Sequence, residues 1–238
     1  MRNSNPQVVI DPDRIAADGF AVLPELIDGA TCDHLRGEAV RLLSGGELRR
    51  GGLRGVLRLS ELFREFVRSD AVVSVMESVL GPGCHAVRSI VFDKTAESNW
   101  LVPWHQDTTI ALRTRCEVDR FGPWSVKDGI PHVRPPSQVL ERMLTLRVHL
   151  DESGFENGPL LVVPASHLGG VLPETSIDPA RCEQSSVTCA TNAGGAVLMR
   201  PLTLHASRRA LNPQHRRVLH LEFAARGALP EPLEWAEF

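Results

Sequence analysis

Two short segments that lie far apart in this sequence carry side chains that could bind one metal ion together. Trp104-His105-Gln106-Asp107 offers an imidazole and a carboxylate, and His205-Ala206-Ser207 offers a second imidazole. Arg216, eleven residues after His205, adds a guanidinium. Two histidines and one carboxylate with open coordination positions suit a mononuclear Fe(II) centre, and a guanidinium can hold a carboxylate bidentately. The set indicates an iron site beside a clamp for a dicarboxylate.

The spacing between His105 and Asp107 fits a β-strand, in which side chains i and i+2 point to the same face. We expect both side chains to reach the metal from one strand, with Gln106 pointing away and His205 supplying the third ligand. A pair of this kind also arises by chance, and His220-Leu221-Glu222 satisfies the same rule. The surrounding sequence must therefore decide between the two pairs.

Short alternating segments with turns between them surround these residues. The Asn157-Gly158 pair favours a turn because both residues tolerate positive φ. Short strands separated by such signals predict an antiparallel barrel or sandwich. The strands are expected at residues 143–151, 160–164, 194–200 and 217–223.

The N-terminal third is predicted to be mostly helical, with residues 1–83 covering a β core at 84–226 within one domain, 1–238. Asp28 and Ser60 are suitable N-caps, as is the Ser69-Asp70 pair, and Gly19 is a suitable helix end. Helices are expected at residues 11–18, 29–43, 61–68 and from 70 to about 80, with a strand at 20–24.

The segment 112–138 lacks a regular pattern and contains several cations and prolines. A long segment after the metal strand is expected to be a lid loop that lines the pocket, and a plain surface insertion is the alternative. We expect Arg113 and Trp124 to contact the substrate from this lid.

Alternation places the neighbours Arg216 and Arg217 on opposite faces of the last strand. Arg216 shares its face with His220 and Glu222, a mixed face that suits a polar pocket, so we favour Arg216 as the clamp. His220 and Glu222 then face inward, more simply as a structural polar pair than as substrate contacts.

A second strand presents Thr145, Arg147, His149 and Asp151 on one face. Polar groups inside a barrel need partners when they are buried. Arg147 and His149 are therefore either members of an internal hydrogen-bond network or substrate-binding residues.

In this order, the motifs resemble the phytanoyl-CoA dioxygenase family, over about residues 87–224. The resemblance implies an Fe(II)/2-oxoglutarate oxygenase on a double-stranded β-helix, the jelly-roll or cupin-like fold, mainly β with covering helices. It is carried by Trp104-His105-Gln106-Asp107, Asn157-Gly158-Pro159-Leu160, Pro164-Ala165-Ser166-His167, His205-Ala206-Ser207 and Arg216-Arg217-Val218-Leu219.

By this resemblance, His105, Asp107 and His205 match the iron ligands. Arg216 matches the arginine that holds the distal carboxylate of 2-oxoglutarate, and Ser207 a serine that supports it. Arg54 and Trp100 lie in segments that help to line the co-substrate or substrate pocket.

The chain departs from the family pattern in two loops. Ala165 stands where glycine is usual, so its turn must avoid positive φ or accept strain. Ala196 stands where the family has an aspartate before the strand of the third ligand. Neither departure touches a predicted ligand.

The implied activity is hydroxylation of a small molecule with dioxygen, releasing succinate and CO2. Two alternatives are a cupin-like metalloenzyme that does not use 2-oxoglutarate and a non-catalytic jelly-roll binding module. Arg216 discriminates between them, because only the first activity requires it.

Composition argues against several other classes of protein. The 238 residues carry a net charge of −3 and no basic block, so nucleic-acid binding is not expected. No apolar run reaches the length of a membrane span, and the N-terminus has no apolar signal region, so a cytoplasmic protein is expected. Five cysteines without Cys-x-x-Cys spacing predict neither a disulfide framework nor a zinc ribbon. The sequence does not specify an oligomeric state.

Overall fold

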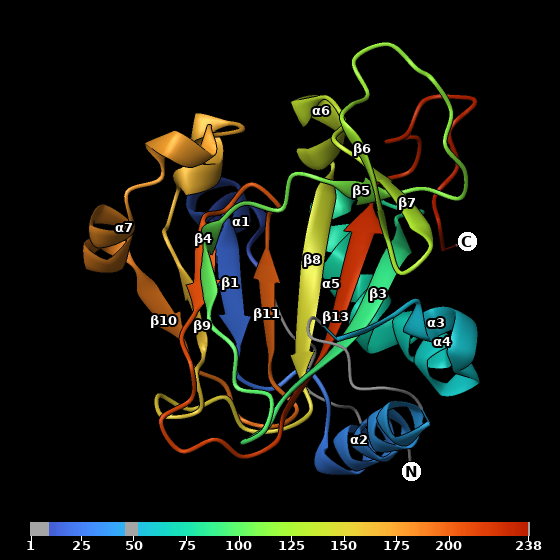
Figure 1. The fold of residues 1–238 in the computed structure, drawn as a ribbon. Helices are drawn as coiled ribbons and strands as arrows, with labels where there is room; N and C mark the ends of the chain where they lie inside the picture. The colour runs from blue at the N-terminus through green and yellow to red at the C-terminus, as the bar shows by residue number, and fades with distance from the viewer. Residues whose placement is uncertain (1–9, 46–51, 238) are drawn as a thin grey trace.

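Two antiparallel sheets face each other, and helices cover the outer face of the larger one (Figure 1). The computed structural model describes residues 10–45 and 52–237. This architecture is the predicted double-stranded β-helix with covering helices.

The larger sheet has the order β1-β11-β8-β13-β3-β2, in which every neighbouring pair is antiparallel. The smaller sheet has the order β10-β9-β12-β4. The strands of the larger sheet are β1 (Phe20–Leu23), β2 (Leu53–Arg54), β3 (His85–Lys94), β8 (Met143–His149), β11 (Ala196–Met199) and β13 (Arg216–Ala224). Those of the smaller sheet are β4 (Val102–His105), β9 (Leu160–Val162), β10 (Val187–Cys189) and β12 (His205–Ser207).

The helices start at the predicted caps. The side chain of Asp28 accepts a hydrogen bond from Thr31 N, and that of Ser60 from Phe63 N. Ser69 precedes its helix but donates to Phe66 O instead of capping. The helices of this part are α1 (Pro12–Asp18), α2 (Gly29–Ser44), α3 (Val56–Leu59), α4 (Glu61–Val67) and α5 (Asp70–Leu80).

The main core lies between these helices and the larger sheet. Leu35, Phe63 and Met76 of the helices are buried in the same cluster as Leu146 and Leu219 of the sheet. Each large apolar side chain that is fully buried contributes about 1.5–3 kcal/mol to folding. The helical layer therefore covers one face of the larger sheet, and the other face of that sheet lines the interior.

The mostly helical N-terminal third also supplies the two edge strands of the larger sheet, β1 and β2. Strand β1 lies where a strand was predicted, at residues 20–24, and it pairs with β11. The two-residue strand β2 was not predicted, because only its pairing with β3 makes it a strand.

The segment 112–138 is not the expected loop. It folds with β5 into a third sheet of order β5-β7-β6, followed by the short helix α6. Asp128 and Gly129, at φ 50° and 76°, form a tight hairpin turn, and prolines on both sides obscure the strand pattern. The elements are β5 (Ile110–Ala111), β6 (Trp124–Lys127), β7 (Ile130–Val133) and α6 (Ser137–Leu140).

The C-terminal tail packs against this third sheet within the same chain. Leu112 and Trp235 form an antiparallel bridge, and Leu233 and Trp235 share a buried cluster with Val133. The remaining short elements lie between β9 and β10: α7 (Pro179–Ser185) and the 3-10 turns Ser166–Gly169 and Glu174–Ser176. No helix in the described ranges is long and apolar enough to cross a membrane.

Candidate metal and co-substrate site

The three predicted ligands converge at one point of the smaller sheet. His105 and His205 face each other in register on β4 and β12, with ring centroids 4.1 Å apart. Nε2 of His205 lies 3.6 Å from Asp107 Oδ2, and Nε2 of His105 lies 3.9 Å from Asp107 Oδ1. The three ligand atoms lie within 4.8 Å of one another, a separation that one metal ion can bridge.

The spacing predicted that Asp107 lies on the same strand as His105, and this prediction is wrong. Strand β4 ends at His105, and the N–H of Asp107 donates to Pro201 O across 2.9 Å. This bond ties the residue after the strand to the segment that leads into His205. The carboxylate still reaches the site, with its oxygens 3.6 Å and 3.9 Å from Nε2 of His205 and of His105.

The protonation pattern of both imidazoles suits metal binding. Nδ1 of His105 lies 2.8 Å from Pro103 O, and Nδ1 of His205 lies 2.8 Å from Thr203 O. A carbonyl only accepts, so each Nδ1 carries the proton and each Nε2 keeps a free lone pair. Burial lowers the pKa of His205 well below its usual value, which keeps the ring neutral as a ligand must be.

Gln106 anchors the loop between the two ligands. Its Nε2 donates to Leu202 O at 2.7 Å and to Gly170 O at 2.8 Å, and its Oε1 accepts from Leu172 N at 2.8 Å. The amide is therefore satisfied on the side away from the metal position, as the alternation predicted. Three bonds to two other segments fix where His105 and Asp107 can lie.

The competing pair His220 and Glu222 lies close by but is already engaged. Arg147 Nη1 donates to His220 Nδ1 at 2.9 Å, so the proton of the neutral ring is on Nε2, 3.2 Å from Glu222 Oε1. Arg88 Nη1 also donates to Glu222 Oε1, at 2.7 Å. The ligand atoms of Asp107, His220 and Glu222 are also close enough together to bind one metal ion. The imidazole of His220, however, has no free lone pair to offer a metal.

A cavity of about 380 Å³ opens between the sheets beside these residues. At one end, Arg216 donates through Nη1 to Gly158 O, while its buried Nε has no acceptor among the described residues. Lys94 pairs with Arg216 in register, and its buried Nζ donates to Ser207 Oγ at 2.9 Å and Arg208 O at 2.8 Å. The ring centre of Trp100 lies 5.6 Å from Lys94 Nζ, and Trp100 lines the cavity.

This end carries positive charge without a counter-ion. Within residues 10–45 and 52–237, no carboxylate forms an ion pair with Arg216, Lys94 or Arg147. Burial, with the charges of Arg216 and Arg147, lowers the pKa of Lys94 to about 7. Buried cations of this kind require an anion from outside the protein.

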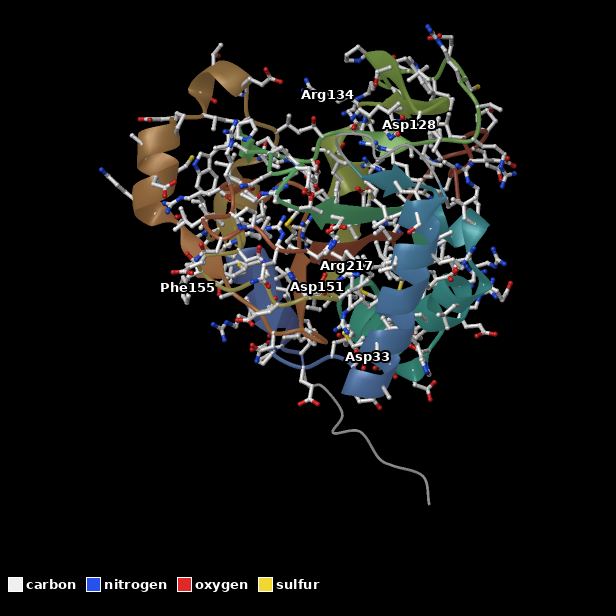
Figure 2. The ribbon with its side chains drawn as sticks, turned by 60° about the horizontal axis from the view of Figure 1, so that its bottom comes forward. Asp33, Asp128, Arg134, Asp151, Phe155 and Arg217 are labelled. Atoms are coloured by element: carbon white, nitrogen blue, oxygen red, sulfur yellow. The ribbon has the colours of Figure 1, made fainter. Side chains whose placement is uncertain are left out.

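Arg216 and Arg217 separate as the alternation predicted. Arg217 points away from the cavity and binds Asp151 through Nε at 2.7 Å and Nη2 at 2.9 Å, on the face that Figure 2 shows. Asp151 also lies 3.2 Å from Arg36 Nε, so it does not share the inner face of Arg147. Strand β8 ends at His149, which frees Asp151 from the alternation.

The other predicted residues divide between the cavity and the surface. Ser207, Arg54, Trp100 and Arg147 line the cavity. His149 is buried, and its ring nitrogens have no hydrogen-bond partner in the described part of the chain. Burial, with the charge of Arg147, lowers its pKa well below the usual value. It is not on the cavity wall.

Arg113 and Trp124 are also not on that wall. Arg113 pairs with Glu234 at 2.6 Å, and Trp124 lies under Arg115, whose Cζ is 5.8 Å from its ring centre. The lid is a sheet rather than a loop, and neither side chain lines the cavity.

Sequence reasoning missed four residues that build the cavity or its cationic end. Arg88, Phe92 and Lys94 come from β3, whose alternation puts every second side chain inward. That period was a usable signal, because Arg88, Phe92 and Lys94 fall on one face, although Ser89 and Asp93 place polar groups on the other. Lys127 comes from the hairpin tip, and the Asp-Gly pair beside it was the available signal.

Comparisons with known proteins agree with this geometry. The sequence model of the phytanoyl-CoA dioxygenase family matches residues 15–218. An ectoine dioxygenase of Stutzerimonas stutzeri is 22% identical over 239 residues, covering 86% of this chain and 72% of its own. An L-proline trans-4-hydroxylase of Streptomyces griseoviridis is 28% identical over 171 residues, covering 72% of this chain and 53% of its own.

Solved structures share the fold. The epimerase SnoN, in complex with Fe3+, α-ketoglutarate and nogalamycin RO, superposes with a TM-score of 0.70 at 19% identity. The match covers 95% of this chain and 93% of that one.

Proposed function

Because the chain belongs to the phytanoyl-CoA dioxygenase family, whose members are Fe(II)/2-oxoglutarate-dependent oxygenases, we propose that His105, Asp107 and His205 bind Fe(II) in this protein. Arg216 binds the distal carboxylate of 2-oxoglutarate, and Ser207 and Lys94 support it. The protein is then a dioxygenase that hydroxylates a small molecule.

One observation carries this proposal: a buried cationic end, without a carboxylate partner in the described residues, lies beside three converging ligand atoms. Arg216 and Lys94 are both buried, and neither forms an ion pair with a carboxylate of the described ranges. The distal carboxylate of a dicarboxylate would supply the missing negative charge beside Arg216. The donor set of two neutral imidazoles and one carboxylate suits Fe(II).

The chain's own residues position and enclose the reaction. The Nδ1 bonds of His105 and His205 fix the two ring planes. Arg216 is planar and permanently charged, so it orients a carboxylate better than a lysine would. Bound Fe(II) and 2-oxoglutarate supply the oxidising chemistry, which consumes dioxygen and releases succinate and CO2.

The size of the cavity supports a small substrate. About 380 Å³ must hold the metal, the co-substrate and the reacting part of the substrate. The names of the two relatives, an ectoine dioxygenase and a proline hydroxylase, fit hydroxylation of a compact aliphatic carbon in this protein too.

An anaerobic titration tests the proposal. Metal-free protein is loaded with Fe(II) and then with 2-oxoglutarate, and the visible charge-transfer band of the chelate is recorded. We expect the band in the wild type and its loss in His105→Ala and Arg216→Ala. Arg217→Ala is the matched control, because this neighbour binds Asp151 and not the cavity.

Each failure has a distinct meaning. Metal binding without the band, in wild type, contradicts the use of 2-oxoglutarate and favours another cupin-like metalloenzyme. Absence of metal binding contradicts the oxygenase altogether. A band that survives Arg216→Ala overturns the assignment of the clamp.

A further inference from the structure

The cavity has two cationic ends, and the predicted iron ligands lie between them. On the paired strands β3 and β13, Lys94 faces Arg216 at one end and Arg88 faces Glu222 at the other. Arg216 and Glu222 are six residues apart on β13, or about 20 Å along an extended strand. Asp107 lies near His220 and Glu222, so the metal position is closer to the Arg88 end.

The Arg88 end holds two ion pairs and a further cation, Lys127, that lies outside both of them. Arg88 is paired with Glu222 at 2.7 Å, and Arg54 is paired with Asp128 at 2.8 Å. Lys127 lines the same end of the cavity and forms no ion pair with a carboxylate in the described part of the chain. It belongs to the hairpin that overlies the end of the sheet where β13 finishes (Figure 1).

The guanidinium groups of Arg54 and Arg88 also line this end of the cavity. Their Nε atoms are closed off from the cavity, so a ligand can reach only the terminal Nη atoms. Each guanidinium carries five N–H donors and uses Nη1 in its ion pair, so further Nη donors remain for an acceptor on a ligand.

We propose that the substrate carries a carboxylate, and that Lys127 binds it together with the free donors of Arg88 and Arg54, on the opposite side of the metal from Arg216. This inference rests on the proposed function, because it assumes that 2-oxoglutarate occupies the Arg216 end. Lys127 is thereby a specificity-determining residue supplied by the lid sheet.

A binding experiment with matched ligands tests this. The anaerobic Fe(II)·2-oxoglutarate complex is titrated in thermal-shift assays with pairs of amino or cyclic imino acids and their primary amides, such as L-proline and L-prolinamide. We expect carboxylates to bind about tenfold more tightly than their amides, the size of one charged hydrogen bond. Lys127→Met should abolish this preference, and Lys127→Arg should restore it.

Arg115→Met is the matched control, because Arg115 lies on the lid side of the chain but pairs with Glu117 and does not line the cavity. The inference is overturned if amides bind as well as carboxylates, if no carboxylate in the panel binds, or if the preference survives Lys127→Met. A parallel titration with 2-oxoglutarate separates the two proposals. Normal 2-oxoglutarate binding without a carboxylate preference overturns this inference alone, whereas lost 2-oxoglutarate binding in wild type overturns the proposed function.

Discussion

Arg54 on β2 and Asp128 at the β6–β7 turn form an ion pair, with Nη1 and Oδ2 2.8 Å apart. The two residues are 74 positions apart in the chain. The pair joins an edge of the larger sheet to the tip of the lid hairpin. Arg54 therefore has two roles. It lines the cavity, as the resemblance implied, and it also ties the lid hairpin to the larger sheet.

Breaking this pair should loosen the hairpin without unfolding the protein. A partly exposed ion pair contributes up to about 1 kcal/mol, so Asp128→Asn should change global stability by no more than that. Hydrogen exchange of the backbone amides at 124–133 should accelerate, because local opening becomes easier. Glu117→Gln, which breaks the exposed Arg115 pair instead, should leave exchange there unchanged. Unaltered exchange in Asp128→Asn would show that the pair does not hold the hairpin.

Lys94 should make co-substrate binding depend on protons. Its folded pKa of about 7 lies below the ordinary 10.5, so between these values the unfolded chain binds more protons and stability rises with pH. An anion bound beside Lys94 raises this pKa again. At pH 8, binding of 2-oxoglutarate should therefore take up a fraction of a proton, measured by calorimetry in buffers of different ionisation enthalpy.

The lysine can be replaced by a side chain of similar length. Lys94→Met should abolish the proton uptake and weaken 2-oxoglutarate binding, yet stabilise the folded protein near pH 7, because a buried charge is removed. Lys127→Met, at the other end of the cavity, should keep the uptake. Equal uptake in wild type and Lys94→Met would assign the proton to another group.

Gln106 should act on the metal through the two ligands that flank it. Gln106→Leu removes three hydrogen bonds that hold this loop, and loss of such supporting contacts weakens metal affinity by about 10-fold to 100-fold. Competition with a chelator measures the Fe(II) affinity directly. The exposed Gln214 provides the control, since Gln214→Leu should leave the affinity unaltered. An unchanged affinity in Gln106→Leu would mean that the backbone alone fixes the loop.

Ala165 carries strain that glycine would relieve. Its φ is 60°, and its N–H donates to Asp18 O at 2.8 Å. The turn therefore adopts the left-handed conformation, which is unfavourable for any residue with a Cβ atom. Ala165→Gly should raise the free energy of unfolding by about 1 kcal/mol, measured by urea denaturation. Ala17→Gly, in the exposed helix α1, should lower it by a similar amount. A loss of stability in both variants would contradict the strain.

Much of the site could be predicted because it depends on residue type and on order in the chain. The three proposed ligands and Arg216 follow from motifs, and strands β8, β9, β11 and β13 follow from alternation. The lid could not be predicted, because Pro123 and Pro131 interrupt its pattern and its partners lie in the C-terminal tail. Lys94 was missed for a related reason: its role appears only when β13 places Arg216 opposite it.

The position of β13 in the larger sheet has a consequence for synthesis of the protein. It lies between β8 and β3, both of which precede it in the chain, and it carries Arg216. A nascent chain that has left the ribosome as far as β11 therefore presents two unpaired central edges with no strand to fill the gap between them. Pairings between such distant segments form slowly, and open edges invite contact with other chains. Newly made protein should depend on chaperones until β13 inserts. Only then does Arg216 come to lie opposite Lys94.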